Sequence, residues 1–293
     1  MIIKTKFYDS FRCTASKCTD TCCAGWEIDV DSDTAEYYES IQGKDGAFVR
    51  ERLIPCDEGV QLCREGERCR FLREDNLCEL IIRLGEESLC DICREHPRFY
   101  SGVDGVTAVG VGLCCPEAAQ LWLSEPCMLV CEDDGETPDK QTNEDVSRLF
   151  SLIEYITGGE GSLGERFSKL INDDGADFSV YGGLRELYCS LEFMESDFGN
   201  SFSENPKCVY DERYCRLAGY FIFRYYFELP ESLCIKFAAA SLIMIAAMGG
   251  ELESDAKNYS KEVEYDPDNL ERIYEFLLRT EGISALCRKV LMC

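Results

Sequence analysis

The feature that most limits how this chain can fold is the uneven placement of its 20 cysteines. Fourteen of them fall within residues 1–131, and the other six are scattered singly through the rest of the chain. Thiols at this density are typical either of a secreted disulfide scaffold or of an intracellular metal protein. Residues 1–7 contain neither the apolar segment nor the cleavage site of a secretory signal. We therefore expect reduced cysteines and a cytoplasmic location.

A change of composition after residue 131 predicts two modules. The chain has 293 residues, enough for one large domain or two modest ones. Residues 132–139, with the sequence EDDGETPD, are acidic and rich in turn formers, as a solvated connection would be. The predicted fold is mainly α, with a cysteine-rich metal-binding module containing short strands at residues 1–131 and an α-helical module at residues 145–293.

Apolar side chains recur at helical spacing through the second module. Val146, Leu149, Phe150 and Ile153 follow the pattern of an amphipathic helix, and the same spacing occurs within 184–191 and 270–277. The last of these helices is predicted to begin after the segment Asp266-Pro267-Asp268 and to end near Gly282. Residues 215–229 and 233–248 are apolar on nearly all faces, which predicts two central helices.

Two further patterns concern the aromatic and apolar runs. Residues 220–227 are mostly aromatic, and we interpret this run as core in preference to a ligand-stacking wall. The apolar run at 237–248 is too short to span a bilayer, which needs ~20 residues, so it predicts a buried helix. In the first module, residues 31–41 are predicted to form a helix, and 26–30 and 103–111 short strands.

The cysteine spacings leave two metals open. The groups are C-x4-C-x3-C-C from residue 13, C-x8-C from residue 69, C-x2-C from residue 90 and a pair at 114–115. Structural zinc usually has paired C-x2-C knuckles or histidines, and only one such knuckle and a single histidine, His96, occur here. Iron–sulfur clusters are held by four cysteines with looser spacing. The pattern favours an iron–sulfur cluster, and zinc remains the alternative.

The net charge of −26 limits the partners that this chain can attract. An acidic protein is repelled by nucleic acid and by anionic membrane surfaces, so we expect neither as a partner. The charge is compatible with a lysine-bearing protein substrate. On charge alone, the solubility that charge gives to a protein is the simpler explanation.

Three blocks of sequence resemble one known family. They read CTASKCTDTCCAGWEIDV at 13–30, CRFLREDNLCELIIRLGEESLCDICREHPR at 69–98, and CPEAAQLWL at 115–123. Their motifs, F-x-C-x4-C-x3-C-C-x-G-W, C-x-F-L…L-C, C-R-x-(aromatic)-P-R and C-P-E-A-A, are similar to those of the flagellin lysine-N-methylase family. The same motifs also resemble the cysteine pattern of small CxxxCC-type zinc- or iron-chelating proteins. His96 departs from the pattern, because the family has an aromatic residue there.

The resemblance implies methylation of lysine side chains on flagellin, with S-adenosylmethionine and a four-iron, four-sulfur cluster as cofactors. Carried over by position, the implied metal ligands are Cys13, Cys18, Cys22, Cys23, Cys69, Cys78, Cys93 and Cys115. The remaining cysteines of the first module, including Cys90, have no counterpart in the family pattern and are not among the implied metal ligands. No catalytic base is indicated.

Two arginines beside Cys93 are candidates for binding the cofactor. Arg94 and Arg98 are expected to pair with the carboxylate of S-adenosylmethionine through a bidentate contact. The alternative is a surface pair with Glu95 or Glu117. An alternative function is also open for the whole chain. A non-enzymatic zinc- or iron-binding protein, or an electron-transfer protein, is compatible with the same cysteine pattern.

Overall fold

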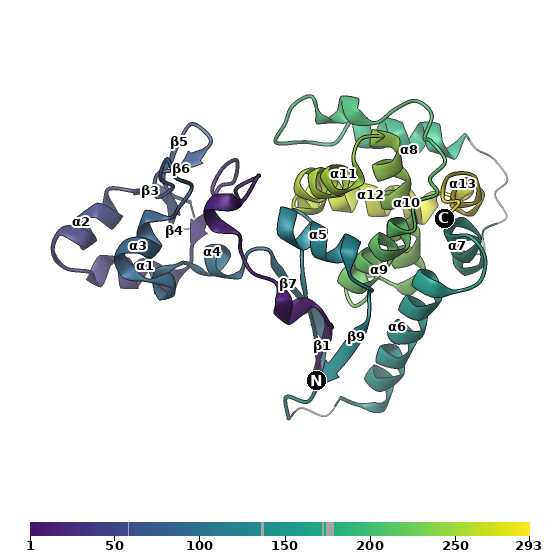
Figure 1. Ribbon diagram of the computed structural model, residues 1–293, viewed down its shortest axis with the longest axis horizontal. Coiled ribbons are helices and arrows are strands. Elements are labelled where there is room, and N and C mark those ends of the chain that lie inside the picture. Colours follow the sequence, from purple (N-terminus) through teal and green to yellow (C-terminus); the bar gives the residue numbers. More distant parts are fainter. Residues whose placement is uncertain (58, 136–137, 172, 174–178) are drawn as a thin grey trace. The chain divides into compact units, whose positions relative to one another are not determined.

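The computed structural model describes residues 1–57, 59–135, 138–171, 173 and 179–293. The predicted acidic connection at 132–139 therefore lies partly outside the described residues. Helices dominate the secondary structure and the strands are short, which confirms the mainly α prediction. The chain divides into two compact units, one of residues 12–98 and one of residues 1–11 with 99–293 (Figure 1).

The division into units does not follow the predicted boundary at residue 131, and strand pairing explains the difference. β1 (Ile2–Thr5) pairs in parallel with β8 (Val106–Val111) and antiparallel with β9 (Leu129–Glu132). With β7 (Arg98–Val103) these strands form a sheet in the order β7-β8-β1-β9. This sheet shares one core with the later helices, so we call the unit of residues 1–11 and 99–293 the helical unit.

The unit of residues 12–98, called the thiol unit below, has a small core of its own. Its main sheet has the order β2-β4-β3, from Asp29–Val30, Gly59–Leu62 and Leu53–Cys56. A second hairpin pairs β5 (Arg64–Glu65) with β6 (Arg68–Cys69). Its helices are α1 (Ser32–Ser40), α2 (Gly43–Arg50), α3 (Glu79–Leu84) and α4 (Asp91–Glu95). The core contains Val30, Tyr38, Val49, Leu62, Phe71, Leu80 and Cys90.

Local signals explain where several of these elements begin. Asp31 caps α1 by accepting a hydrogen bond from the backbone N–H of Thr34, as expected for a helix starting at this position. The strand predicted at 26–30 is limited to Asp29–Val30. The strand predicted at 103–111 is instead a hairpin of β7 and β8, because Gly105 takes a positive φ of 77° between them.

The helical unit contains α5 (Pro116–Ser124), α6 (Lys140–Gly158), α7 (Leu163–Ile171), α8 (Val180–Cys189), α9 (Arg213–Tyr225), α10 (Glu231–Met248), α11 (Leu252–Tyr259), α12 (Pro267–Arg279) and α13 (Ile283–Val290). A π-helical turn, Ser260–Glu264, connects α11 to the segment before α12. The helices predicted at 215–229 and 233–248 are confirmed as α9 and α10, with nearly every side chain buried.

The predicted start and end of the helix at 270–277 can be compared with the structure. α12 begins at Pro267, inside the segment after which it was predicted to start, and Asp266 caps it by accepting a hydrogen bond from the backbone N–H of Asn269. Gly282 does not end that helix, because α12 stops at Arg279 and Gly282 instead precedes α13 with a φ of 94°. Among the described helices, α10 alone is long and apolar enough to cross a membrane, and 78% of it is buried as in a core helix.

Candidate functional site

Three cysteine-bearing segments of the thiol unit meet through their backbones. The N–H of Cys69, at the end of β6, donates to the carbonyl oxygen of Cys23 at 2.9 Å. Leu72 and Cys78 form an antiparallel bridge, and the N–H of Glu79 donates to the carbonyl oxygen of Phe71. These contacts bring the C-C pair at 22–23 and both members of the C-x8-C motif to one place.

The C-x2-C motif joins the same cluster through α4. Cys90 precedes the first residue of α4, is 1% exposed and belongs to the core of the thiol unit. Cys69, Cys78 and Cys93 are half-buried and pack against that core. The N–H of Asp91 donates to a carboxylate oxygen of Asp31 at 2.9 Å, which fixes the start of α4 against the start of α1.

Electrostatic interactions show that these thiols are close to one another. A hydrogen bond with Cys22 lowers the pKa of Cys23 to about 7. The pKa of Cys93 is raised by its hydrogen bond with Cys90, by burial and by repulsion from the other sulfurs. Burial raises the pKa of Cys69 to about 11, with Cys23 and Cys78 adding repulsion. Several thiolates cannot ionise together at such a site without a compensating cation.

Backbone groups are also oriented toward the sulfurs. The N–H groups of Leu80 and Ile81, in the first turn of α3, oppose the effect of burial on the pKa of Cys78. Helix N-termini stabilise thiolates in this way, as metal-binding cysteines require. The donor chemistry therefore fits a thiophilic metal or cluster. The sulfurs are nevertheless paired by hydrogen bonds, and the described residues contain no ready group of three or more ligands arranged to hold a metal ion.

The structure gathers part of the predicted ligand set. It brings together Cys22, Cys23, Cys69, Cys78 and Cys93, and it adds Cys90, which was expected to be extra. The C-x2-C spacing of Cys90 and Cys93 was the sequence signal for the proximity of these two sulfurs. Cys13 and Cys18 have local partners, since the Sγ of Cys13 accepts from the N–H of Ala15 and that of Cys18 donates to the carbonyl of Asp20. Cys115 precedes α5 in the helical unit.

The candidate cofactor arginines have different surroundings. Arg94 is 46% exposed and pairs with Asp91 and with Glu95, which is one of the surface pairs left open by the sequence. Arg98 is half-buried at the first position of β7. His96 faces Trp26 with ring centroids 6.3 Å apart, and burial lowers the pKa of His96 to about 4. The imidazole is therefore neutral at pH 7.

The helical unit contains a buried charged network that the sequence did not indicate. The carboxylate of Glu264, in the π-helical turn, accepts hydrogen bonds from the hydroxyls of Tyr220 and Tyr225 at 2.9–3.1 Å. The Nε of Arg224 lies 3.5 Å from the same carboxylate, and its side chain is 11% exposed. Short π-helical segments often mark functional positions. The only signal in the sequence was an arginine inside an aromatic run.

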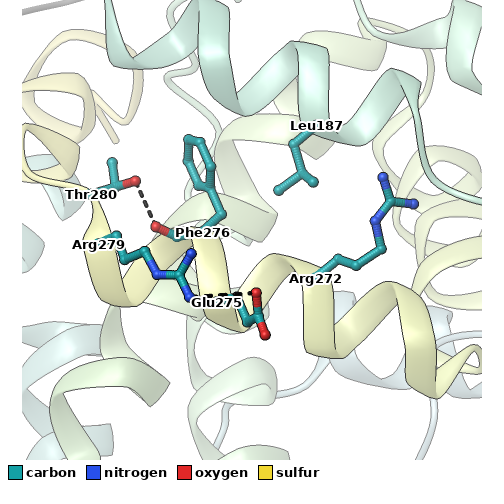
Figure 2. Close-up of a pocket in the computed structure, with 6 residues that line it drawn as sticks. All are labelled: Leu187, Arg272, Glu275, Phe276, Arg279 and Thr280. Atoms are coloured by element: carbon teal, nitrogen blue, oxygen red, sulfur yellow. Dashed lines mark hydrogen bonds and ion pairs between the residues drawn. The ribbon is translucent and has the colours of Figure 1, made fainter.

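A surface cavity of about 450 Å³ lies between α8 and α12 of the helical unit. Figure 2 shows Leu187 and Phe276 on its apolar side, with Arg272, Glu275 and Arg279 along α12. Arg272 donates to the backbone and hydroxyl oxygens of Ser190, and Arg279 lies 3.7 Å from Glu275. The cavity contains no cysteine, so it is distinct from the thiol cluster.

Comparisons with known proteins relate the chain to lysine-N-methylases. It is 28% identical over 221 residues to the lysine-N-methylases of Salmonella choleraesuis (strain SC-B67) and Salmonella typhimurium (strain LT2), covering 65% of this chain and 52% of each relative. It is also 28% identical over 137 residues to flagellar biosynthetic protein FliU of Salmonella muenchen, covering 43% of this chain and 78% of FliU.

These matches support a relation at the level of a family, and the chain spans about half the length of the lysine-N-methylases it matches. No model of a protein family matches the chain. No solved structure gives a significant match.

Proposed function

We propose that this chain is a protein-lysine N-methyltransferase that methylates flagellin with S-adenosylmethionine and carries an iron–sulfur cluster. The observation that carries the proposal is the similarity to two proteins named lysine-N-methylase, together with FliU, whose name places it in flagellar biosynthesis. The gathered thiols of the thiol unit support the cluster as a cofactor.

Four thiols of the cluster are the proposed ligands. Cys23, Cys69, Cys78 and Cys93 come from separate segments and match the looser spacing of iron–sulfur sites. Cys69, Cys78 and Cys93 pack on one apolar core, and Cys23 interacts electrostatically with Cys69, Cys78 and Cys93. Cys22 and Cys90 are the neighbouring sulfurs to which Cys23 and Cys93 hydrogen bond. When bound, an iron–sulfur cluster supplies Lewis-acidic iron, and zinc is the alternative occupant of the same thiolates.

Methyl transfer to lysine needs a neutral amine, whereas a free lysine has a pKa of about 10.4. The amine nitrogen forms a bond to the methyl carbon as the carbon–sulfur bond of the sulfonium breaks, and the ammonium proton leaves to a base. The proposed part of Arg98 and Arg94 is to bind the carboxylate of S-adenosylmethionine. For Arg94 this requires release of Asp91, to which it is bound. The charge of −26 favours the approach of a lysine-bearing surface.

Two measurements on the same preparation test the proposal. Anaerobically purified chain is expected to contain about four irons and four sulfides, and to transfer labelled methyl from S-adenosylmethionine to flagellin. Cys78→Ser is expected to lower the metal content and destabilise the fold, because metal binding is coupled to folding. Cys208→Ser is the matched control, because this exposed thiol lies in the helical unit. Equal losses in both variants would show that substitution acts through general packing.

The alternative is a non-enzymatic metal-binding or electron-transfer protein. It is favoured by the thiols' location in a compact unit of their own, which needs no second substrate to bind metal. The two functions differ in one requirement, because only a methyltransferase binds S-adenosylmethionine. Metal-loaded chain that neither binds S-adenosylmethionine nor methylates flagellin would exclude the enzyme and leave the alternative.

A further inference from the structure

A second pair of thiols lies in the helical unit, which contains none of the four proposed cluster ligands. Cys215 is in the first turn of α9 and is 6% exposed, whereas Cys293 follows α13 and is half-buried. The two side chains are hydrogen-bond partners. They are separated by 78 positions in the sequence, so their meeting is a property of the fold.

The backbone on both sides holds Cys293 in this position. Its carbonyl oxygen accepts a hydrogen bond of 2.5 Å from the N–H of Leu163, at the start of α7. The N–H of Gly164 donates to the carbonyl of Leu291, and the N–H of Met292 donates to the carbonyl of Val209. The segment that carries Cys293 is thus fixed between α7 and residue 209, and the approach of the two sulfurs does not depend on a loose end.

A buried guanidinium accompanies the pair. Arg166 of α7 is 5% exposed, and its Nη2 lies 2.9 Å from the Sγ of Cys215. Its Nη1 donates to the carbonyl of Gly159, and its Nε has no hydrogen-bond partner. None of the ion pairs among the described residues joins Arg166 to a carboxylate. A buried positive charge needs a negative partner, and the sulfur of Cys215 is the atom placed to carry it.

The surroundings of Cys215 favour its thiolate form. The hydrogen bond from Cys293 and the charge of Arg166 lower the pKa of Cys215 to about 7, against the effects of burial and of the nearby Glu212. The same hydrogen bond and burial raise the pKa of Cys293, which keeps its proton. In contrast, burial is the largest influence on Cys234 and Cys287 and raises the pKa of both. A thiolate beside a cation with a second thiol in reach is the usual arrangement of an oxidation-sensitive cysteine.

We propose that Cys215 and Cys293 form a redox-modification site that reacts with hydroperoxides, with Cys215 as the attacking thiolate and Cys293 as the resolving thiol. In the first step the sulfur of Cys215 bonds to a peroxide oxygen, the O–O bond breaks, and hydroxide leaves. Cys215 is then a sulfenic acid. In the second step the sulfur of Cys293 bonds to that of Cys215, the S–O bond breaks, and water leaves with the thiol proton. The two sulfurs lose two electrons, which reduce the peroxide.

The direct test uses the full chain as purified. Reduced protein is treated with about one equivalent of hydrogen peroxide, quenched with N-ethylmaleimide and digested with trypsin. Cleavage after Arg213, Arg216 and Lys289 releases residues 214–216 and 290–293. These peptides are expected to appear linked, lighter by two hydrogen atoms, before Cys208 is modified. If both thiols stay labelled with N-ethylmaleimide while the exposed Cys208 is oxidised, the proposal is wrong.

Single substitutions separate the two roles. Cys293→Ser removes the resolving thiol, so dimedone is expected to trap a sulfenic acid at Cys215. Cys208→Ser is the matched control and should leave the rate of linkage unchanged. Arg166→Lys keeps the charge and should preserve the reaction, whereas Arg166→Met should slow it several-fold. Equal reaction rates in Arg166→Met and wild type would refute the role of the guanidinium. The wild-type measurement decides the proposal even if a variant does not fold.

Discussion

Replacing Glu264 with glutamine tests whether the buried charged network stabilises the helical unit. The side chain of Glu264 is fully buried, and its carboxylate contacts Arg224, Tyr220 and Tyr225. The substitution keeps the shape of the side chain, but it leaves the guanidinium of Arg224 buried without its counter-charge. It also turns an amide N–H₂ toward groups that are themselves donors.

The expected loss follows from the unpaired charge. Removing one partner of a buried ion pair typically costs about 3–5 kcal/mol. In a unit of about 200 residues, each kcal/mol corresponds to roughly 2–4 °C in Tm, so Glu264→Gln should lower Tm by about 6–20 °C. Glu275→Gln is the matched control. It breaks only an exposed pair with Arg279, worth at most about 1 kcal/mol.

Urea unfolding followed by tryptophan fluorescence measures the effect in the correct unit. The chain has two tryptophans, and Trp26→Phe leaves only Trp122, which is fully buried with its ring centroid 5.1 Å from that of Tyr220. The double variant Arg224→Met, Glu264→Gln should be more stable than Glu264→Gln alone, because it removes the unpaired charge. If Glu264→Gln is within 1 kcal/mol of wild type, or if the double variant is the less stable of the two, the reasoning is refuted.

Two further predictions concern pH and packing. The pKa of His96 in the folded protein is about 4, below the ordinary value of 6.5, because the imidazole is buried. The preference of the fold for the neutral imidazole therefore contributes to the stability of the thiol unit above pH 6.5, and that contribution is lost as the pH falls toward 4. His96→Phe should flatten this part of the pH–stability curve, and an imidazole NMR signal that titrates near 6.5 in the folded protein would contradict the prediction. Gly164→Ala should destabilise the helical unit by about 1–3 kcal/mol, because the new Cβ would lie 2.2 Å from the carbonyl oxygen of Cys287. Gly182→Ala, in α8 with open space around it, should instead stabilise by roughly 0.5–1 kcal/mol, and similar denaturation midpoints for both variants would show that the close contact is absent.

Sequence reasoning succeeded where the signal was local. The apolar runs at 215–229 and 233–248 predicted α9 and α10, because a helix that is apolar on all faces must be buried. Asp31 and Asp266 marked the starts of α1 and α12, because each side chain accepts a hydrogen bond from a nearby N–H. The proximity of Cys23 to Cys69, in contrast, rests on a hydrogen bond between segments 46 positions apart, which no short spacing predicts.

The remaining features depend on contacts between distant residues. Nothing near Ile3 shows that it pairs with Ala108 and Cys131, so the unit boundary was placed by composition alone. Arg224 and Glu264 are 40 positions apart, on different helices, and their pairing exists only after α9 and the π-helical turn are packed. The burial of Cys90 in the core of the thiol unit likewise depends on the packing of α4, which its spacing from Cys93 does not indicate.

The pairing of β1 with β8 has a consequence for the order in which the chain folds. Residues 2–5 must wait for a partner that lies about a hundred positions further along the sequence, and closing a flexible loop of that length is entropically unfavourable and slow. The whole thiol unit, residues 12–98, is inserted within that loop. If this unit folds first, it shortens the effective loop, so the early folding of the cysteine-rich segment would accelerate formation of the sheet. If the proposed metal binds the nascent chain, withholding it should then delay folding of the helical unit, although none of the proposed cluster ligands Cys23, Cys69, Cys78 and Cys93 belongs to that unit.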